Sequence, residues 1–244
     1  MLDLHTHILP GLDDGPRSWA EALEMARLAA ADGIRGLAAT PHLYRHRRVY
    51  QGEMNTPDRI GPMVQRLREE LSAAGIDLQI FPGCEAPLCP ELLDLLQAGQ
   101  VLTLNDRKRH IFLEMPDTVI PPATEDLVFR LNAVGIVPIL THPERNAAFQ
   151  EMPGKLGRLL RLDCLAQITA ASLTGGFGRR AARFAQKLVQ QGYVRLVASD
   201  AHDARHRPPQ LSPGIEKLAR LVGESKAWDM VTVVPKKILQ GMPV

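Results

Sequence analysis

The chain has 244 residues, of which 45% are hydrophobic and 23% are charged, so it can bury a large core and disorder is not expected. Its 29 Lys and Arg residues nearly balance its 27 Asp and Glu residues, which argues against binding of nucleic acid through bulk charge. Its three cysteines suggest no disulfide framework, and no apolar run approaches the roughly 20 residues of a membrane span. The sequence therefore predicts a cytoplasmic protein without direct membrane insertion, and it leaves a homo-oligomer open.

Short apolar, β-prone runs alternate with longer stretches of helical periodicity, the pattern of parallel strands joined by crossover helices. Seven strands are expected, at residues 2–7, 36–40, 78–83, 110–115, 136–141, 166–169 and 194–199. The first helix is the best marked, because Ser18 and Glu21 have the spacing of a capping box and Gly33 follows as a stop. Further helices are expected at residues 60–74, 90–97, 124–133, 178–191, 214–222 and 225–230. This order of elements favours one barrel-like α/β domain over residues 1–244.

The first expected strand ends in a His-x-His pair, His5 and His7. Alternate residues of a strand point the same way, so both imidazoles can meet one cation. Chance alone would produce such a pair in roughly a quarter of chains with this many histidines, so the pair needs support from elsewhere in the sequence.

That support comes from ionisable residues at the ends of six of the seven expected strands. The carboxyl ends of parallel strands gather on one face of a barrel, where active sites are built. The candidates are His5, His7, Asp14, His42, Glu85, Glu114, His142, Asp200 and His202. Each of them alone is more often a hydrogen-bonded core residue, but so many ionisable groups beside apolar strands carry a heavy desolvation cost unless an opposite charge lies among them. Bound cations are the simplest explanation.

The same residues lie in segments that resemble a known family. The segments are residues 3–15, 39–42, 83–85, 112–114, 141–146 and 198–202. Through them the chain is similar to the PHP-domain phosphatases, and within these to the bacterial tyrosine-protein phosphatases of the CpsB/YwqE type, found with capsule and exopolysaccharide genes. The strings Leu-Asp-Asp-Gly at 12–15 and His-Pro-Glu-Arg-Asn at 142–146 are specific to this branch. A His-x-His pair alone would also admit amidohydrolases and other PHP proteins.

The resemblance implies a distorted seven-stranded (β/α)7 TIM-like barrel of the PHP type, with three divalent metal ions at its carboxyl-terminal face. One ion would take His5, His7, Glu85 and Asp200; a second would take Glu114 and His142 and share Glu85; a third would take Asp14, His42 and His202. Ligation by nitrogen and oxygen without cysteine suits Mn²⁺, Zn²⁺ or Fe²⁺, and the resemblance favours manganese. Four carboxylates against three divalent cations leave an excess of about two positive charges, which would attract a phosphate dianion.

Two arginines complete the expected site. Arg145 and Arg207 follow two of the candidate histidines by three and five residues, and the family uses arginines at matching positions to hold phosphate. Both are therefore expected to bind phosphate and to stabilise the transition state, because guanidinium forks suit phosphoryl oxygens. The alternative for Arg145 is a structural pair with Glu144 or another acid.

The implied chemistry is in-line attack of a metal-bridging hydroxide on phosphorus, with no phosphoenzyme. The pKa of tyrosine, about 10, makes a phenolate a better leaving group than an alkoxide, which favours an aryl phosphate without excluding other esters. No cysteine of the chain begins a Cys-x5-Arg loop, so catalysis by a nucleophilic cysteine is disfavoured.

The favoured hypothesis is a metal-dependent protein-tyrosine phosphatase whose partner is a tyrosine-phosphorylated protein, an autophosphorylated bacterial tyrosine kinase that controls exopolysaccharide or capsule synthesis. The alternatives are a PHP phosphatase of a small metabolite such as histidinol phosphate, a phosphodiesterase, and a non-enzymatic, metal-bound interaction module. The Leu-Asp-Asp-Gly string argues against the first alternative, and no ligand or arginine is missing that would favour the last. The basic segment from Tyr44 to Tyr50 is either a lid or landing patch for an acidic phosphopeptide, or an exposed, solvated loop.

Overall fold

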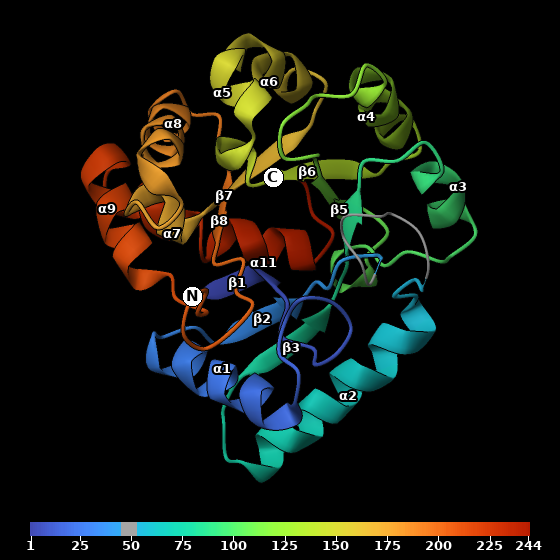
Figure 1. Ribbon diagram of the computed structural model, residues 1–244, viewed down its shortest axis with the longest axis vertical. Coiled ribbons are helices and arrows are strands. Elements are labelled where there is room, and N and C mark those ends of the chain that lie inside the picture. Colours follow the sequence, from blue (N-terminus) through green and yellow to red (C-terminus); the bar gives the residue numbers. More distant parts are fainter. Residues whose placement is uncertain (45–52) are drawn as a thin grey trace.

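The computed structural model describes residues 1–44 and 53–244, and in this part of the chain eight strands form two parallel sheets (Figure 1). The first sheet has the order β1-β2-β3 and the second the order β4-β5-β6-β7-β8. The strands are β1 (Leu2–Thr6), β2 (Gly36–Ala39), β3 (Gln79–Pro82), β4 (Glu85–Pro87), β5 (His110–Glu114), β6 (Val137–Thr141), β7 (Leu165–Thr169) and β8 (Leu196–Ala198). The predicted α/β class with parallel strands is thus confirmed.

The predicted closed barrel of seven strands is not confirmed, because the chain changes sheets just after the strand expected at 78–83. β3 ends at Pro82, and β4 begins at Glu85 and pairs with β5 in the other sheet. At the change of sheet, a Cβ on Gly83 would lie 2.9 Å from Cγ2 of Thr40 and 3.1 Å from Cδ2 of Leu104. A larger residue would force these side chains to shift, so the change of sheet is packed around a glycine.

Isolated bridges join the two sheets at two places. Thr6 bridges to Ala201, and the backbone N–H of Asp200 donates to the carbonyl of His5 at 2.9 Å, which joins β1 to the segment after β8. At the second place, His42, which follows the middle strand β2, bridges to Glu85 in β4. These contacts bring the carboxyl ends of strands from both sheets to one place, although no continuous ladder closes the ring in the described residues.

The described residues contain eleven α-helices, most of which lie around the outside of the sheets (Figure 1). They are α1 (Trp19–Ala31), α2 (Pro57–Ala73), α3 (Leu92–Gln97), α4 (Thr124–Ala133), α5 (Ala147–Glu151), α6 (Pro153–Leu160), α7 (Ala170–Leu173), α8 (Gly178–Gln190), α9 (Ser212–Val222), α10 (Glu224–Asp229) and α11 (Val233–Leu239), with 3-10 turns η1 (Leu104–Asp106) and η2 (Pro143–Arg145). The predicted cap of α1 is confirmed, since the Ser18 hydroxyl accepts from the backbone N–H of Glu21 at 3.2 Å. The second helix starts three residues earlier than predicted, because Pro57 occupies its first turn, where the missing N–H costs nothing.

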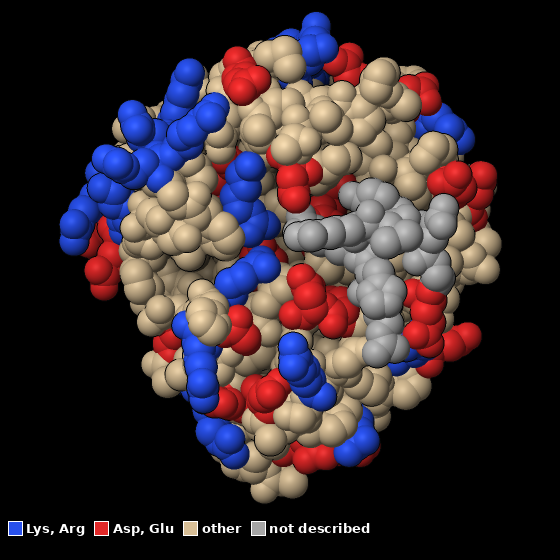
Figure 2. Space-filling view, viewed as in Figure 1, with Lys and Arg blue, Asp and Glu red and all other residues tan. Residues whose placement is uncertain are grey.

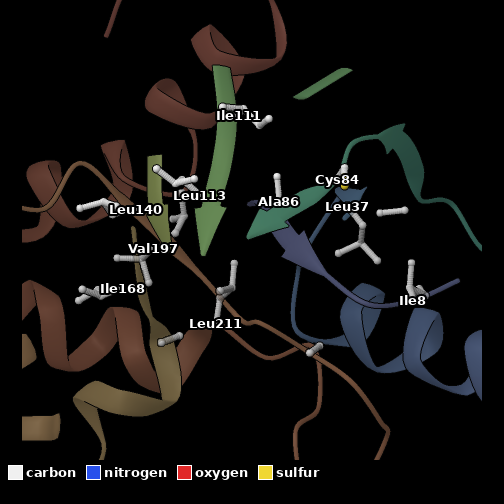
Figure 3. Packing of buried hydrophobic residues seen from close by; sticks show 14 of the residues in the cluster. Ile8, Leu37, Cys84, Ala86, Ile111, Leu113, Leu140, Ile168, Val197 and Leu211 are labelled. Atoms are coloured by element: carbon white, nitrogen blue, oxygen red, sulfur yellow. The ribbon is translucent and has the colours of Figure 1, made fainter. Parts of the chain in front are cut away.

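Apolar side chains fill the space on both faces of the strands. Towards the inside, Leu4, Phe112 and Leu196 pack with Ile238 and Leu239 of α11, which Figure 1 shows in red near the centre of the molecule. Towards the outside, the residues labelled in Figure 3, most of which lie in strands, belong to the larger cluster of buried hydrophobic residues. The inner cluster supports the site directly, since the ring of Phe112 stacks on the imidazole of His5 at 4.9 Å. Of the helices in the described part of the chain, none is long and apolar enough to cross a membrane.

Candidate metal centre

The nine candidate ligands lie together at the carboxyl ends of the strands. Eight of them are buried, and Asp14 is the exposed one. Their ligand atoms form four overlapping groups, and within each group all atoms lie within 4.8 Å of one another. The groups are His7, Asp14, His42 and His202; His5, His7 and Asp200; His5, Glu85 and His142; and His42, Glu85 and Glu114. The convergence of residues from both ends of the chain follows from the parallel strand directions.

Each ring of the His-x-His pair is fixed by a hydrogen bond on its outer side. Nδ1 of His5 lies 2.9 Å from Oε1 of Gln167, and Nδ1 of His7 lies 2.7 Å from Oδ2 of Asp13. Both partner atoms are acceptors, so in the neutral form of each ring Nδ1 carries the proton and the lone pair of Nε2 faces inward. The two Nε2 atoms are 3.3 Å apart, and each lies 3.4 Å from Oδ1 of Asp200. This is the orientation that metal-ligating histidines adopt.

Sequence reasoning missed Asp13 and Gln167, which hold these rings. Asp13 is next to a predicted ligand in the Leu-Asp-Asp-Gly string, and its carboxylate also accepts from the backbone N–H groups of Gly15 and His42, each at 2.9 Å. Burial raises the pKa of Asp13, but the neighbouring His7 and His42 outweigh it and hold that pKa below its usual value. Asp13 is therefore an ionised acceptor. Gln167 lies 162 positions from His5, so no local pattern links the two.

Glu85 lies at the centre of the cluster. Its Oε1 is 3.3 Å from Nε2 of His5 and 3.2 Å from Nε2 of His142, and its Oε2 is 2.9 Å from Nδ1 of His42. The carboxylate is fully buried, yet neither oxygen receives a hydrogen bond of acceptable geometry. A buried carboxylate without directed donors is costly, and several lone pairs that point at a common centre fit a cation better than a hydrogen. The nitrogen and oxygen donors present here therefore fit divalent metal ions.

Asp14 and His202 form the outer part of the cluster. Oδ1 of Asp14 lies 3.3 Å from Nε2 of His202 and 3.6 Å from Nε2 of His42. The Asp14 side chain is 55% exposed, so this part of the cluster is open to solvent and to a ligand. The ring of His202 lies tilted against that of His7 with centroids 3.8 Å apart, which joins the outer group to the inner one.

Two of the histidines are neutral in the metal-free protein. Burial, together with the nearby charge of Arg145, lowers the pKa of His142 to about 3. Burial, together with the charge of His7, lowers the pKa of His202 to about 4. Neutral imidazoles at neutral pH have lone pairs available for a metal ion, because binding does not first require loss of a proton.

Asp200 connects the cluster to the two predicted arginines. Its Oδ1 faces His5 and His7. Its Oδ2 forms an ion pair with Nη2 of Arg145 at 2.7 Å and accepts a hydrogen bond from Nη2 of Arg207. Burial raises the pKa of Asp200, but Arg145 and the other cations outweigh it and hold that pKa well below its usual value. Both arginines thus lie beside the ligand cluster, as predicted from the sequence.

Glu144, which was the predicted alternative partner of Arg145, has other partners. Oε1 of Glu144 accepts from the Ser172 hydroxyl at 2.6 Å and from the backbone N–H of Thr169 at 3.0 Å. Glu144 therefore ties η2 to the end of β7, and this tie positions the following residue, Arg145, at the site.

A further residue missed from the sequence is Phe177. The guanidinium of Arg145 lies over its ring at 4.5 Å, and that of Arg207 lies over the same ring at 5.7 Å. Cations over an aromatic face are attracted by its negative potential. One ring and one carboxylate therefore hold both arginines side by side, although the like charges repel.

Figure 2 shows this face of the molecule, with a hollow near its centre that has Lys and Arg side chains on one side and Asp and Glu side chains on the other. The basic segment Tyr44 to Tyr50 extends beyond the described residues. Tyr44 itself bridges to Met54, while residues 45–50 lie outside the described part. Neither hypothesis for this segment is tested.

The three cysteines are buried free thiols. Burial raises the pKa of Cys89 to about 11 and that of Cys164 to about 12, and burial beside Glu85 raises the pKa of Cys84 well above its usual value. All three are protonated at neutral pH, and the thiol is a poor nucleophile. The thiols therefore do not supply an alternative catalytic centre.

Comparison with known proteins agrees with this geometry. A family model described as "Capsular polysaccharide synthesis, CpsB/CapC" matches residues 1–240. The chain is 38% identical over 207 residues to the tyrosine-protein phosphatase YwqE of Bacillus subtilis, which covers 85% of the chain and 79% of the relative. It is 27% identical over 245 residues to the tyrosine-protein phosphatase CpsB of Streptococcus pneumoniae, which covers 98% of both proteins.

The structure also matches a solved one over its whole length. The match is to crystal structures described as YwqE from Bacillus subtilis and CpsB from Streptococcus pneumoniae, "unique metal-dependent tyrosine phosphatases". Its TM-score is 0.94 at 33% sequence identity, and it covers 100% of this chain and 96% of the other. The sequence relatives and the fold agree, and the chain belongs to the CpsB/CapC family of capsular polysaccharide synthesis proteins.

Proposed function

We propose that the protein is a metal-dependent protein-tyrosine phosphatase. The observation that carries the proposal is the contact of Asp200 with two different sets of groups, ligand histidines on one oxygen and a pair of arginines on the other. This arrangement sets an anion site directly beside a cation site, as hydrolysis of a phosphate ester requires. The relatives named above are tyrosine-protein phosphatases, which supports phosphotyrosine as the substrate.

The ligand groups support three divalent metal ions. We assign His5, His7, Glu85 and Asp200 to one ion, Glu114 and His142 with shared Glu85 to a second, and Asp14, His42 and His202 to a third. The third set lies within one group of ligand atoms, whereas the first and second sets each draw on two overlapping groups. His42 reaches Glu85 as well as Asp14, so it lies between the second and third positions. The nitrogen and oxygen donors suit Mn²⁺, Fe²⁺ and Zn²⁺ alike. Mn²⁺ is the ion we favour, on the family resemblance of the sequence.

Divalent ions at such a site lower the pKa of bound water and polarise the phosphoryl group. The protein's own residues supply the rest. Arg145 and Arg207 bind the equatorial phosphoryl oxygens, and Asp200 with Phe177 holds their guanidinium groups in position before the substrate arrives. Asp13 and Gln167 keep the rings of the His-x-His pair in the tautomer whose Nε2 atoms face inward. A phenolate leaving group, with a pKa of about 10, needs little protonation.

The proposed partner is a tyrosine-phosphorylated protein, and we propose an autophosphorylated bacterial tyrosine kinase of capsule or exopolysaccharide synthesis. The family name supports the link to capsule synthesis, and the names of the relatives support phosphotyrosine. A phosphatase of a small metabolite such as histidinol phosphate, a phosphodiesterase and a non-enzymatic module are less favoured. All nine ligands and both arginines are present in one cluster, which leaves the module without a supporting observation.

The test uses protein stripped of metal by a chelator and reloaded with Mn²⁺, Fe²⁺ or Zn²⁺ in turn. We expect metal-dependent hydrolysis of p-nitrophenyl phosphate and of a phosphotyrosyl peptide, and much slower hydrolysis of histidinol phosphate and a phosphoseryl peptide. Failure with every metal would refute the proposal, and faster turnover of histidinol phosphate would favour the metabolite phosphatase.

Substitution of single ligands tests the assignment of the third ion. His202→Ala should lower turnover by at least about a hundredfold, because loss of a ligand weakens the outer ion that meets the substrate. The matched control is His206→Ala, since the His206 side chain is 88% exposed and lies four residues further along the same segment. Circular dichroism would show that both variants are folded, and full activity of His202→Ala would contradict the assignment.

A further inference from the structure

One face of α8 is strongly basic. It carries Arg179, Arg180, Arg183 and Lys187, all exposed, and α8 contains no Asp or Glu. We call these four residues the α8 basic face. The formal net charge of the whole chain is only +2, so the four cations of this helix exceed the charge excess of the entire protein. Figure 2 shows Lys and Arg gathered over the region that α8 occupies in Figure 1, on the same side as the central hollow.

The packing of α8 fixes the direction in which these cations point. The opposite side of the helix is buried through Ala181, Phe184, Ala185, Leu188 and Val189. Positions 180, 183 and 187 are three and four residues apart, so they lie on one side of the helix. Packing of the apolar side therefore keeps the basic side of α8 facing solvent.

The charge of this face is weakly compensated by the contacts that the structure records for it. Nη2 of Arg180 lies 3.9 Å from Oε1 of Glu151, at the outer limit of an ion pair, and both side chains are more than two-thirds exposed. Nε of Arg183 donates to the carbonyl of Arg179 at 3.4 Å, which leaves the charge in place. Exposed pairs of this kind are largely screened, so the face keeps an attractive potential for anions.

The α8 basic face is continuous with the phosphate arginines. Phe177, whose ring lies under Arg145 and Arg207, immediately precedes α8. The helix also packs against η2, the turn that contains Arg145. From Phe177 to Lys187 the helix rises about 15 Å, which an extended peptide covers with about five residues. A substrate whose phosphate lies at the arginines can thus reach the whole face with residues close to its phosphotyrosine.

We propose that the α8 basic face binds an acidic polypeptide segment that flanks the phosphotyrosine of the protein substrate. The inference rests on the proposed function and deepens it, because it assigns substrate selection to a surface outside the metal centre. Continuity with the anion site favours a substrate polypeptide over a nucleic acid or an anionic membrane, neither of which would need to meet the phosphate arginines. Electrostatic complementarity of this kind acts on encounter and affinity and leaves the chemical step unchanged.

The test compares two variants that lose the same charge. The first combines Arg179→Gln, Arg180→Gln, Arg183→Gln and Lys187→Gln. The control combines Arg35→Gln, Arg130→Gln, Lys226→Gln and Lys236→Gln, four exposed cations on other parts of the molecule. The substrates are p-nitrophenyl phosphate, a phosphotyrosyl peptide flanked by glutamates, and the same peptide flanked by serines, all with the Mn²⁺-loaded enzyme.

We expect the α8 variant to raise KM for the glutamate-flanked peptide about five- to thirtyfold, with little change for the serine-flanked peptide or for p-nitrophenyl phosphate. The preference of the unmodified enzyme for the acidic peptide should also fall as salt is added. The control variant should keep that preference.

An unchanged KM for the acidic peptide in the α8 variant would overturn the inference, as would an equal rise in the control variant. Loss of binding to vesicles that contain phosphatidylserine, or to single-stranded DNA, without any change in peptide KM would also overturn it and assign the face to another partner. Absence of p-nitrophenyl phosphate hydrolysis in the unmodified enzyme would instead refute the proposed function, so the two failures are distinguishable.

Discussion

Replacement of Phe177 by Leu should weaken phosphate binding while the fold and the metal ions stay in place. Leu keeps most of the apolar volume but has no aromatic face for the guanidinium groups at 4.5 and 5.7 Å. A cation–π contact at a partly exposed site contributes about 0.5–1 kcal/mol, and the Arg145 and Arg207 side chains are 17% and 27% exposed. Loss of both contacts therefore costs about 1–2 kcal/mol, or about five- to thirtyfold in affinity.

The assay is steady-state hydrolysis of p-nitrophenyl phosphate at saturating Mn²⁺, with inorganic phosphate as a competitive inhibitor. KM and the inhibition constant of phosphate should rise together, and the concentration of Mn²⁺ that gives half-maximal activity should stay the same. Phe129→Leu is the matched control, because Phe129 is 63% exposed on α4. Unchanged phosphate inhibition in Phe177→Leu would refute the role of the ring, and a changed Mn²⁺ requirement would mean that Phe177 supports the metal ligands instead.

Three further predictions concern the surroundings of the site. Gln167→Leu removes the acceptor for Nδ1 of His5 and should raise the Mn²⁺ concentration for half-maximal activity about 10- to 100-fold, with activity recovered at saturating metal. Burial raises the pKa of Asp3 to about 6, so in chelator-treated protein the contribution of Asp3 to stability is present below about pH 4 and is lost as the pH rises through 6. Asp3→Asn should remove this loss. It should therefore raise the free energy of unfolding by at most about 3 kcal/mol at pH 8, and leave it unchanged at pH 4. Gly83→Ala should lower the free energy of unfolding in urea by about 1–3 kcal/mol, because the new Cβ would overlap neighbouring side chains. The control Gly61→Ala has open space around it in α2 and should raise the free energy of unfolding by about 0.5–1 kcal/mol. Equal effects of the two substitutions would contradict the packing argument.

The sequence predicts those parts of the fold whose signals are local. The span of α4 agrees with the expected 124–133, and the Ser18 cap lies where the capping spacing puts it. The change of sheet at Gly83 was not predictable in this way, because alternation of side chains shows that a segment is extended and does not show which strand it pairs with. α6 was missed since Pro153, Gly154 and Gly157 obscure its helical pattern, although a proline in the first turn is compatible with a helix.

The candidate site was predictable to the extent that its residues end strands. All nine ligands and both arginines lie in one cluster, because parallel strands direct their carboxyl ends to the same face. The residues that orient them were not predictable, since Gln167 and Phe177 act on partners distant in sequence. Their side chains carry no motif, and only the folded chain shows what they contact.

The backbone at two ligands shows why a strand end is a demanding place for a metal ligand. His142 follows β6 with φ of +36°, and Asp200 follows β8 with φ of +54°, both in the left-handed region that most side chains avoid. Glycine would adopt this conformation without strain, but it has no ligand atom. Strain of about 1–3 kcal/mol at each position persists where the surrounding structure imposes it, as the bond from Asp200 N–H to the His5 carbonyl does. With a positive φ at both strand ends, His142 reaches Glu85 and Asp200 reaches His5, so residues after a strand, and not only those within it, reach a common centre.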